Sequence, residues 1–243
     1  MEPQLHVITR GSSSKLLLLN NCYILVVVLL CFVLSDSVPF PPKEEVDALR
    51  EIADELHKRD WDFSLNPCDN NTNFVNPTGS KKFNNTVLCN CTAAECHVSH
   101  IILKGQDLSG VLPPSLAKLP HIAYFDVSQN YLNGSIPRQW ASTKLQKLAL
   151  AVNRLSGRIP DFLGNITTLT SLTLESNMFF GNVPASLGNL VNLETLFLSA
   201  NNLSGEFPKE LSGLTKLTVL RLTGNNFVGK LPNFSSWLNL QKV

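Results

Sequence analysis

The chain carries almost no net charge, because its 20 Lys and Arg residues nearly balance its 19 Asp and Glu residues. It lacks the basic excess that nucleic-acid binding requires. No run of like charges predicts an interaction tail either. Charge therefore says little about partners, and we expect no nucleic-acid ligand.

Groups of residues that could carry out catalysis are also missing. No Ser/His/Asp arrangement or pair of carboxylates can be argued, and the regularly spaced glycines are interpreted as turn residues rather than a phosphate-binding loop. His100 is interpreted as an edge residue and not as a catalyst. We expect no enzyme activity, no cofactor and no metal.

Residues 1–37 are interpreted as a signal peptide. Arg10 and Lys15 precede an apolar stretch, Cys22–Leu34, and small residues follow it. The alternative is a signal anchor, since Leu16–Leu34 covers 19 residues, enough to span a bilayer. Either reading sends the chain into the secretory pathway.

Four cysteines follow this segment, namely Cys68, Cys89, Cys91 and Cys96. An even, clustered set in an exported chain predicts two disulfides. The alternative is a four-cysteine zinc site, but the paired C-x-x-C spacing of such sites is absent. Of the three connectivities, Cys68–Cys89 with Cys91–Cys96 is preferred, because the close pair would staple a short loop.

Seven Asn-x-Ser/Thr sequons support export and predict N-glycosylation. They begin at Asn70, Asn84, Asn90, Asn133, Asn165, Asn202 and Asn233. The first three lie outside the repeats described next, so the repeat pattern does not account for them.

A 24-residue pattern returns from Ile101 onward, and it organises the rest of the chain. An Asn column recurs at Asn130, Asn153, Asn177, Asn201 and Asn225, with Gln106 in the first copy. Gly follows four residues later and Pro three residues after that, and the copies are spaced 24, 23, 24, 24 and 24 residues apart. Such a period predicts a solenoid of stacked repeats.

Each column of the repeat has a physical reason. In Leu-x-Leu both leucines share one face of a strand and stack on neighbouring repeats, while the residue between them points the other way. The Asn amide can satisfy backbone groups where the chain turns inward. We expect a concave parallel sheet with strands near 101–103, 125–127, 148–150, 172–174, 196–198 and 220–222, and short 3₁₀ turns on the convex side.

Residues 38–97 are predicted to cap the first repeat, since a solenoid exposes core leucines at its end. Apolar residues at three- and four-residue spacing, from Val46 to Leu56, predict an amphipathic helix of roughly 15–20 residues that begins after Pro42. Residues 98–243 would then hold six repeats and part of a seventh. The fold class is α/β, a right-handed leucine-rich repeat solenoid with an N-terminal helical disulfide cap.

The string Asn153-Arg-Leu-Ser-Gly-Arg-Ile-Pro160 resembles the plant-specific leucine-rich repeat. The Pro-rich start, Trp61 and Cys68 resemble the N-terminal cap of plant leucine-rich repeat receptor-like Ser/Thr kinases. The segment 88–101 resembles the subfamily whose ectodomain joins such repeats to a malectin-like domain, followed by a membrane span and a kinase. The resemblance covers about 45–243.

The chain departs from that family at its end. Val243 stands where the next strand should start, and no malectin-like domain, membrane span or kinase motif is present. We interpret the chain as truncated to the N-terminal repeat region. Leu220, Leu222, Phe227 and Leu231 are then expected to be more exposed than their counterparts Leu172, Leu174, Phe179 and Val183.

Ligand binding is predicted on the concave face, by residues that flank the leucines of each strand. The candidates are Tyr124, Asp126, Lys147, Thr173, Glu175, Phe197 and Arg221. Among them Tyr124, Phe197 and Arg221 are the expected anchors, because aromatic and Arg side chains dominate interface energetics. An extended peptide of about 7–9 residues would cross such a sheet.

The predicted function is recognition of an extracellular peptide, glycan or protein ligand, or pairing with another receptor ectodomain, at the plasma membrane or in the apoplast. Contact with a membrane would come only through the missing C-terminal part or an uncleaved N-terminal segment. The alternative is a secreted soluble repeat protein that acts as an enzyme inhibitor or receptor decoy.

Overall fold

The computed structural model describes residues 38–69, 74, 85–230, 235 and 237–242, all within the unit Val38–Val243. The predicted signal peptide at 1–37, and the sequon residues Asn70, Asn84 and Asn233, lie outside the described residues. None of the helices in the described ranges has the length and hydrophobicity needed to cross a bilayer.

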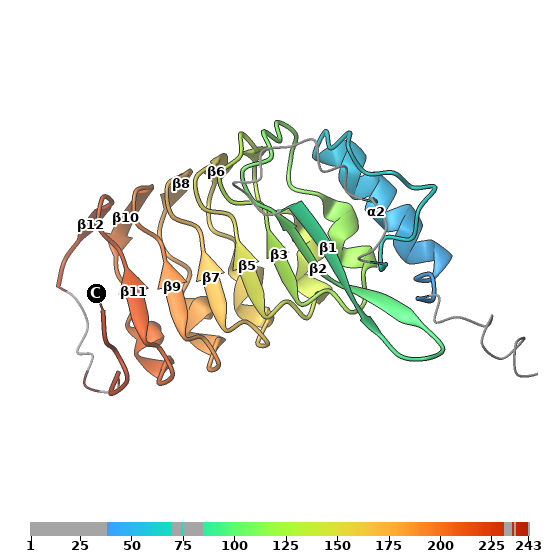
Figure 1. Cartoon of the computed structure of the whole chain (residues 1–243). Helices are drawn as coiled ribbons and strands as arrows, with labels where there is room; N and C mark the ends of the chain where they lie inside the picture. Colours follow the sequence, from blue (N-terminus) through green and yellow to red (C-terminus); the bar gives the residue numbers. More distant parts are fainter. Residues whose placement is uncertain (1–37, 70–73, 75–84, 231–234, 236, 243) are drawn as a thin grey trace, which may run out of the picture. The chain divides into compact units, whose positions relative to one another are not determined.

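The main sheet carries the Leu-x-Leu strands side by side (Figure 1). Its strands, in spatial order, are β1 (Asn85–Cys91), β2 (Cys96–Leu103), β3 (Tyr124–Asp126), β5 (Lys147–Ala149), β7 (Ser171–Thr173), β9 (Thr195–Phe197) and β11 (Val219–Arg221). Every pair from β2 to β11 is parallel, and each central residue faces its counterpart one coil away. The predicted parallel sheet is confirmed, with β3 to β11 beginning one residue earlier than expected.

A second, narrower sheet was not predicted. It consists of β4 (Asn133–Gly134), β6 (Arg154–Gly157), β8 (Met178–Gly181), β10 (Asn202–Glu206) and β12 (Asn226–Val228). These strands are parallel and lie along the upper edge of the coils in Figure 1. The stretch after each recurring Asn therefore forms a strand and not only a bend.

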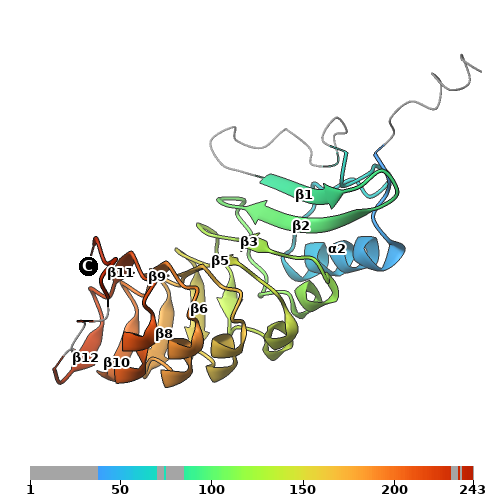
Figure 2. The ribbon, with the colours of Figure 1, turned by 90° about the horizontal axis from the view of Figure 1, so that it is seen from below.

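On the convex side of each coil, opposite the main sheet, the chain forms a 3₁₀ helix, as the three-residue apolar spacing predicts. Within residues 85–230 these helices are η1 (Pro114–Lys118), η2 (Arg138–Ser142), η3 (Asp161–Asn165), η4 (Ala185–Asn189) and η5 (Lys209–Gly213). Each follows directly on the Pro of the repeat, whose ring restricts the chain at the point where the helix starts. Seen from below in Figure 2, the coils stack in chain order.

The recurring Asn side chains join neighbouring coils, as predicted. Asn153 Nδ2 donates to the carbonyl oxygens of Val127 (3.0 Å) and Leu150 (3.1 Å), while its Oδ1 accepts the amide N–H of Leu132 (3.0 Å). Asn130, Asn177, Asn201 and Asn225 make the same type of contacts. Buried backbone groups that have no partner within their own coil are satisfied in this way.

The cap begins with helix α2 (Lys43–Glu55), whose 13 residues make it shorter than predicted. Leu56 ends the helix, and His57 then adopts a positive φ of 56°. Leu49 and Ile52 are buried as expected, but the buried residue of the first turn is Glu45 rather than Val46. The Glu45 carboxylate accepts hydrogen bonds from His97 Nδ1 (2.6 Å) and the Val98 amide N–H (2.7 Å).

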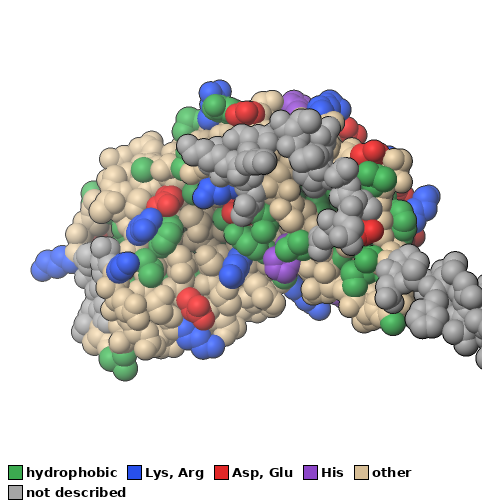
Figure 3. All heavy atoms as spheres, viewed as in Figure 1, with side chains coloured by type: hydrophobic (Ala, Val, Ile, Leu, Met, Phe, Trp, Pro, Cys, Tyr) green, Lys and Arg blue, Asp and Glu red, His purple; other side chains and the backbone are tan. Residues whose placement is uncertain are grey.

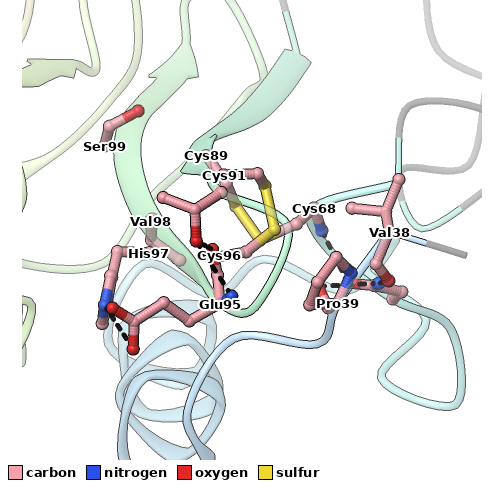
Figure 4. Close-up of a disulfide and its surroundings, with 12 residues drawn as sticks. Val38, Pro39, Cys68, Cys89, Cys91, Glu95, Cys96, His97, Val98 and Ser99 are labelled. Carbon is pink, nitrogen blue, oxygen red and sulfur yellow. Dashed lines mark hydrogen bonds and ion pairs between the residues drawn. A yellow bond between two sulfur atoms is a disulfide. The ribbon is translucent and has the colours of Figure 1, made fainter. Parts of the chain in front are cut away.

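The four cysteines form the disulfides Cys68–Cys89 and Cys91–Cys96, which is the preferred pairing of the sequence analysis. They gather where the β1–β2 hairpin meets the loop that carries Cys68 (Figure 4). The hairpin is antiparallel and was not predicted; its short turn is closed by Cys91–Cys96. Because all four sulfurs are bonded in pairs, they offer no thiolate to the zinc ion of the alternative interpretation.

The expected exposure of the last coil is wrong for Leu220, which is only 1% exposed. The segment that contains Trp237 and Lys242 covers it, because the amide N–H of Leu220 donates to the Lys242 carbonyl (3.0 Å) and Trp237 is buried in the core. Leu222 and Phe227 are partly buried, whereas Leu174 and Phe179 are fully buried, so the expectation holds for these two. Leu231 lies outside the described residues.

Candidate ligand-binding face

The main sheet brings the seven predicted ligand-binding residues onto one face, here called the concave face. Six of them lie within β3, β5, β7, β9 and β11, and Glu175 lies two residues after β7. Their side chains flank the inward-pointing leucines and therefore point away from the core. On the side shown in Figure 3, acidic and basic side chains are interspersed, without a large patch of one sign.

A first group of interacting side chains, the β2–β5 cluster, consists of His100, Tyr124, Asp126 and Lys147. The Tyr124 hydroxyl donates to Asp126 Oδ2 (3.1 Å), and the His100 ring meets the Tyr124 ring edge-on at 5.9 Å between centroids. Lys147 Nζ lies 5.8 Å from the centre of the Tyr124 ring. The exposed ammonium therefore stands next to the aromatic surface of Tyr124.

Asp126 differs from the other candidates because it is buried. Its Oδ1 accepts the Ser128 amide N–H (2.9 Å), while its Oδ2 accepts the Tyr124 hydroxyl. Both carboxylate oxygens are thus engaged by the chain itself. Asp126 acts as a support that orients Tyr124, and the Asp-x-Ser spacing was the sequence signal that could have indicated this role.

Two pKa shifts follow from this packing. Partial burial and the positive charge of Lys147 lower the pKa of His100 below its ordinary value, so the ring stays neutral to lower pH. Burial, together with the adjacent Asp126 carboxylate, raises the pKa of Tyr124 to about 12. The β2–β5 cluster therefore presents a neutral imidazole, a phenol and one cation at neutral pH. The sequence analysis interpreted His100 only as an edge residue, whereas in the structure its ring packs against Tyr124 as a member of this cluster.

A second group, the β7–β11 cluster, consists of Glu175, Phe197 and Arg221. The guanidinium carbon of Arg221 lies 4.1 Å from the centre of the Phe197 ring, and Nη1 lies 3.5 Å from Glu175 Oε2. Stacking on the ring and pairing with the carboxylate fix the direction of a long side chain that is otherwise exposed. The guanidinium has five N–H donors, so most of them stay available to a ligand.

Between the two clusters the concave face carries only small side chains, at Ala149, Ser171 and Thr173. The strands of the two clusters are hydrogen-bonded in an unbroken order from β2 to β11. The predicted anchors Tyr124, Phe197 and Arg221 thus lie at two separate places on one continuous surface, and small side chains occupy the area between them.

The comparisons with known proteins agree with this architecture. The family described as "Leucine rich repeat" matches residues 167–227. A probable leucine-rich repeat receptor-like serine/threonine-protein kinase of Arabidopsis thaliana is 47% identical over 151 residues, which cover 61% of this chain and 15% of the relative. The chain thus spans less than a sixth of the length of this curated relative.

Solved structures of plant receptors are similar as well. The leucine-rich repeat ectodomain of the receptor kinase GASSHO1/SCHENGEN3 from Arabidopsis thaliana, in complex with Casparian strip integrity factor 2, matches 64% of this chain and 19% of its own at 32% identity, with a TM-score of 0.62. The plant peptide hormone receptor RGFR1, in complex with RGF2, matches 56% of this chain and 22% of its own at 35% identity, with a TM-score of 0.54.

Among the similar solved structures are the ectodomains of the receptor kinase SOBIR1 and of BIR2 from Arabidopsis thaliana, so the matched part of this chain corresponds to a leucine-rich repeat ectodomain and not to a kinase domain. The matches do not favour the alternative of a soluble inhibitor or decoy, and they imply an extracellular or cell-surface location. The chain is a capped leucine-rich repeat solenoid with homologues among the leucine-rich repeat receptor-like serine/threonine kinases of plants.

Proposed function

We propose that the chain binds an extended extracellular peptide across the concave face, with the two side-chain clusters as its anchor points. The observation that carries this proposal is the Arg221 side chain, which is exposed yet held in one direction by Phe197 and Glu175. An exposed guanidinium that is already ordered loses less conformational entropy when a ligand binds. Two ligand-bound relatives of the same fold, one of them described as a peptide hormone receptor, support this choice of ligand class.

Each cluster would contact a different part of the peptide. Arg221 can donate to a carboxylate or carbonyl of the ligand, while Phe197 offers apolar surface beside it. Tyr124 and Lys147, two to four strands away from Phe197 and Arg221, would receive a second contact. The small residues Ser171 and Thr173 would let the peptide backbone approach the sheet between them. Asp126 would act indirectly, by holding Tyr124.

The wider context is part of the proposal. Residues 38–97 would form the cap and 98–243 the repeats of a receptor-like kinase that carries a malectin-like domain, a membrane span and a kinase in its remaining length. The ligand would then be bound outside the plasma membrane or in the apoplast, and pairing with a second ectodomain would transmit the signal. Residues 1–37 would direct this export.

A binding experiment with a matched control tests the proposal. The secreted full chain is used to select peptides from a displayed library of random nonapeptides, and the affinity of the selected peptides is then measured. Phe197→Ala with Arg221→Ala should weaken binding by roughly 100-fold or more, as expected for two interface anchors.

The control pair is Tyr131→Ala with Arg154→Ala. Arg154 also stacks on an aromatic ring, at 5.1 Å from the centre of Tyr131, but it lies on β6 in the second sheet. Its removal should change the affinity less than about threefold. Equal losses in both variants would show that binding does not take place on the concave face, and a library that yields no binder would exclude short peptides as the ligand class.

A further inference from the structure

Strand β8 carries an exposed apolar pair that its neighbours in the second sheet lack. Met178 and Phe180 are 52% and 45% exposed, and both side chains point outward, since Phe179 between them is buried. The repeat places Ser156 and Ser204 at the positions that correspond to Phe180. The two coils that flank β8 thus have Ser where β8 has Phe180, whereas the last coil has the exposed Val228. An aromatic ring at this position is therefore particular to β8 and offers a ligand or a modification an apolar surface to pack on.

The residue beside Phe180 in the next coil is the first residue of a sequon. Asn202 and Phe180 are direct partners in the parallel pairing of β10 with β8, and Asn202 is exposed. Asn202-Leu-Ser204 has no Pro in the middle position. Directly paired residues of adjacent strands point to the same side of the sheet, so the Asn202 amide and the Phe180 ring emerge next to each other.

The hydrogen bond that Asn202 makes within the described part of the chain engages its side-chain oxygen and not the nitrogen that can be modified. Asn226 Nδ2 donates to Asn202 Oδ1 (2.5 Å), which engages the oxygen of the Asn202 amide and fixes its orientation. The nitrogen of that amide, Nδ2, is the atom to which an N-linked sugar is attached.

We propose that Asn202 carries an N-linked glycan whose first N-acetylglucosamine lies on the ring of Phe180 and covers it. In the secretory route, Asn202 Nδ2 would form a bond to C1 of the first sugar of a polyprenyl-pyrophosphate-linked oligosaccharide. The bond from C1 to the pyrophosphate oxygen breaks, the lipid pyrophosphate leaves, and Nδ2 loses one proton. The C–H groups on one face of the sugar then stack on the electron-rich face of the ring.

Spacing and comparison with other sequons single out this site. A sugar on Asn202 starts about 4.8 Å from the Phe180 strand, which is within the width of one pyranose ring. Asn133 is instead paired with Arg154, Asn90 with His97, and Asn165 lies on helix η3. Of these four described sequons, only Asn202 has an exposed aromatic side chain as its direct strand partner. The glycan would therefore stabilise the second sheet while leaving the concave face open.

The test uses the full chain secreted from a glycosylating plant cell line, and it asks whether the glycan and Phe180 act together. Peptide mass mapping should find Asn202 occupied. Asn202→Gln should lower the melting temperature by roughly 2–4 °C and raise hydroxyl-radical modification of Phe180 at least about twofold. In a Phe180→Ser background, where the residue found in neighbouring coils is restored, Asn202→Gln should change the melting temperature by less than about 1 °C.

Two further variants complete the design. Asn165→Gln removes a sequon far from Phe180 and should leave Phe180 modification unchanged. Trimming the glycans to a single N-acetylglucosamine should keep the protection of Phe180, since only the first sugar is required. An unoccupied Asn202 would overturn the proposal, and so would an equal loss of stability from Asn202→Gln in both backgrounds. Full radical modification of Phe180 in the occupied protein would also overturn it.

Discussion

The cap and the repeats are held together by different kinds of contact. The cap uses contacts that occur once, namely two disulfides, the buried Glu45 carboxylate and a buried Lys58 that pairs with Asp60 at 2.5 Å. The repeats use one contact many times, the Asn side chain that joins each coil to the next. Removing a cap contact should therefore act locally, whereas removing a repeat contact should weaken the stack on both sides.

Lys58 shows how the two regions are joined. Burial lowers its pKa, although the Asp60 carboxylate acts in the opposite direction. Lys58 Nζ also donates to Gln106 Oε1 (3.4 Å), and Gln106 stands in the first coil where later coils have Asn. The first coil thus has Gln instead of Asn at the position where its side chain contacts Lys58 of the cap, a contact that the later coils cannot make.

The largest effect is expected from Asn130→Ala. Asn130 Oδ1 accepts the N–H groups of Gln106 and Leu108, and Nδ2 donates to two backbone carbonyls at 2.8 Å. Leaving these buried groups without partners should cost about 3–6 kcal/mol of unfolding free energy. Urea denaturation measures the loss. Asn226→Ala, which removes an exposed side chain, serves as control and should cost less than about 1 kcal/mol. Equal losses would mean that the recurring Asn does not stabilise the stack.

A smaller and more local effect is expected when Cys68 and Cys89 are both replaced by Ser. The disulfide closes a loop of 21 residues in separation, and its loss should cost about 2–4 kcal/mol. Hydrogen exchange should accelerate in α2 and β1 and stay unchanged in β7 and β9. The double substitution leaves Cys91–Cys96 intact and creates no free thiol. Uniform acceleration along the chain would show that the cap and the repeats unfold as one unit.

The smallest effect concerns His100, on the strand that the cap and the repeats share. Its pKa is lowered mainly by burial and secondly by Lys147, so Lys147→Ala should raise the pKa of His100 part of the way back toward its ordinary 6.5. A proton-binding curve from NMR measures the change. The folded state prefers the neutral ring, so stability is full above the ordinary pKa and falls as pH drops through it. Arg221→Ala, in the other cluster, should leave the pKa of His100 unchanged.

The sequence predicted the features that depend on one residue type at a fixed spacing. The leucine columns, the Asn contacts and the 3₁₀ helices follow from such positions. The second sheet was missed because the stretch around Leu155 and Gly157 was interpreted as a bend. In the structure Gly157 adopts a φ of 90° yet still belongs to β6. Local propensity could not show this, because the strand exists only when coils pair.

Features held by partners distant in the sequence also escaped prediction. Val46 was expected on the buried side of its helix and Glu45 was not considered, and only the β2 backbone and His97, more than 50 residues later, explain the burial of Glu45. The same holds for the predicted site. Tyr124, Phe197 and Arg221 were named as anchors, but the supporting role of Asp126 was not predicted. A one-dimensional pattern indicates which face a side chain occupies, and it does not indicate which neighbour engages it.

Because the register of the main sheet does not shift from strand to strand, equivalent residues of neighbouring coils are separated by a constant distance. Each coil advances the concave face by about 4.8 Å, while an extended peptide lying across the strands advances by about 3.4 Å per residue. The two scales come back into phase only after about five coils, or seven ligand residues. Equivalent residues of a peptide with a short sequence repeat would therefore contact different positions on successive coils. If the concave face binds a peptide as proposed, it would favour ligands of irregular sequence and would discriminate between them by length as well as by composition.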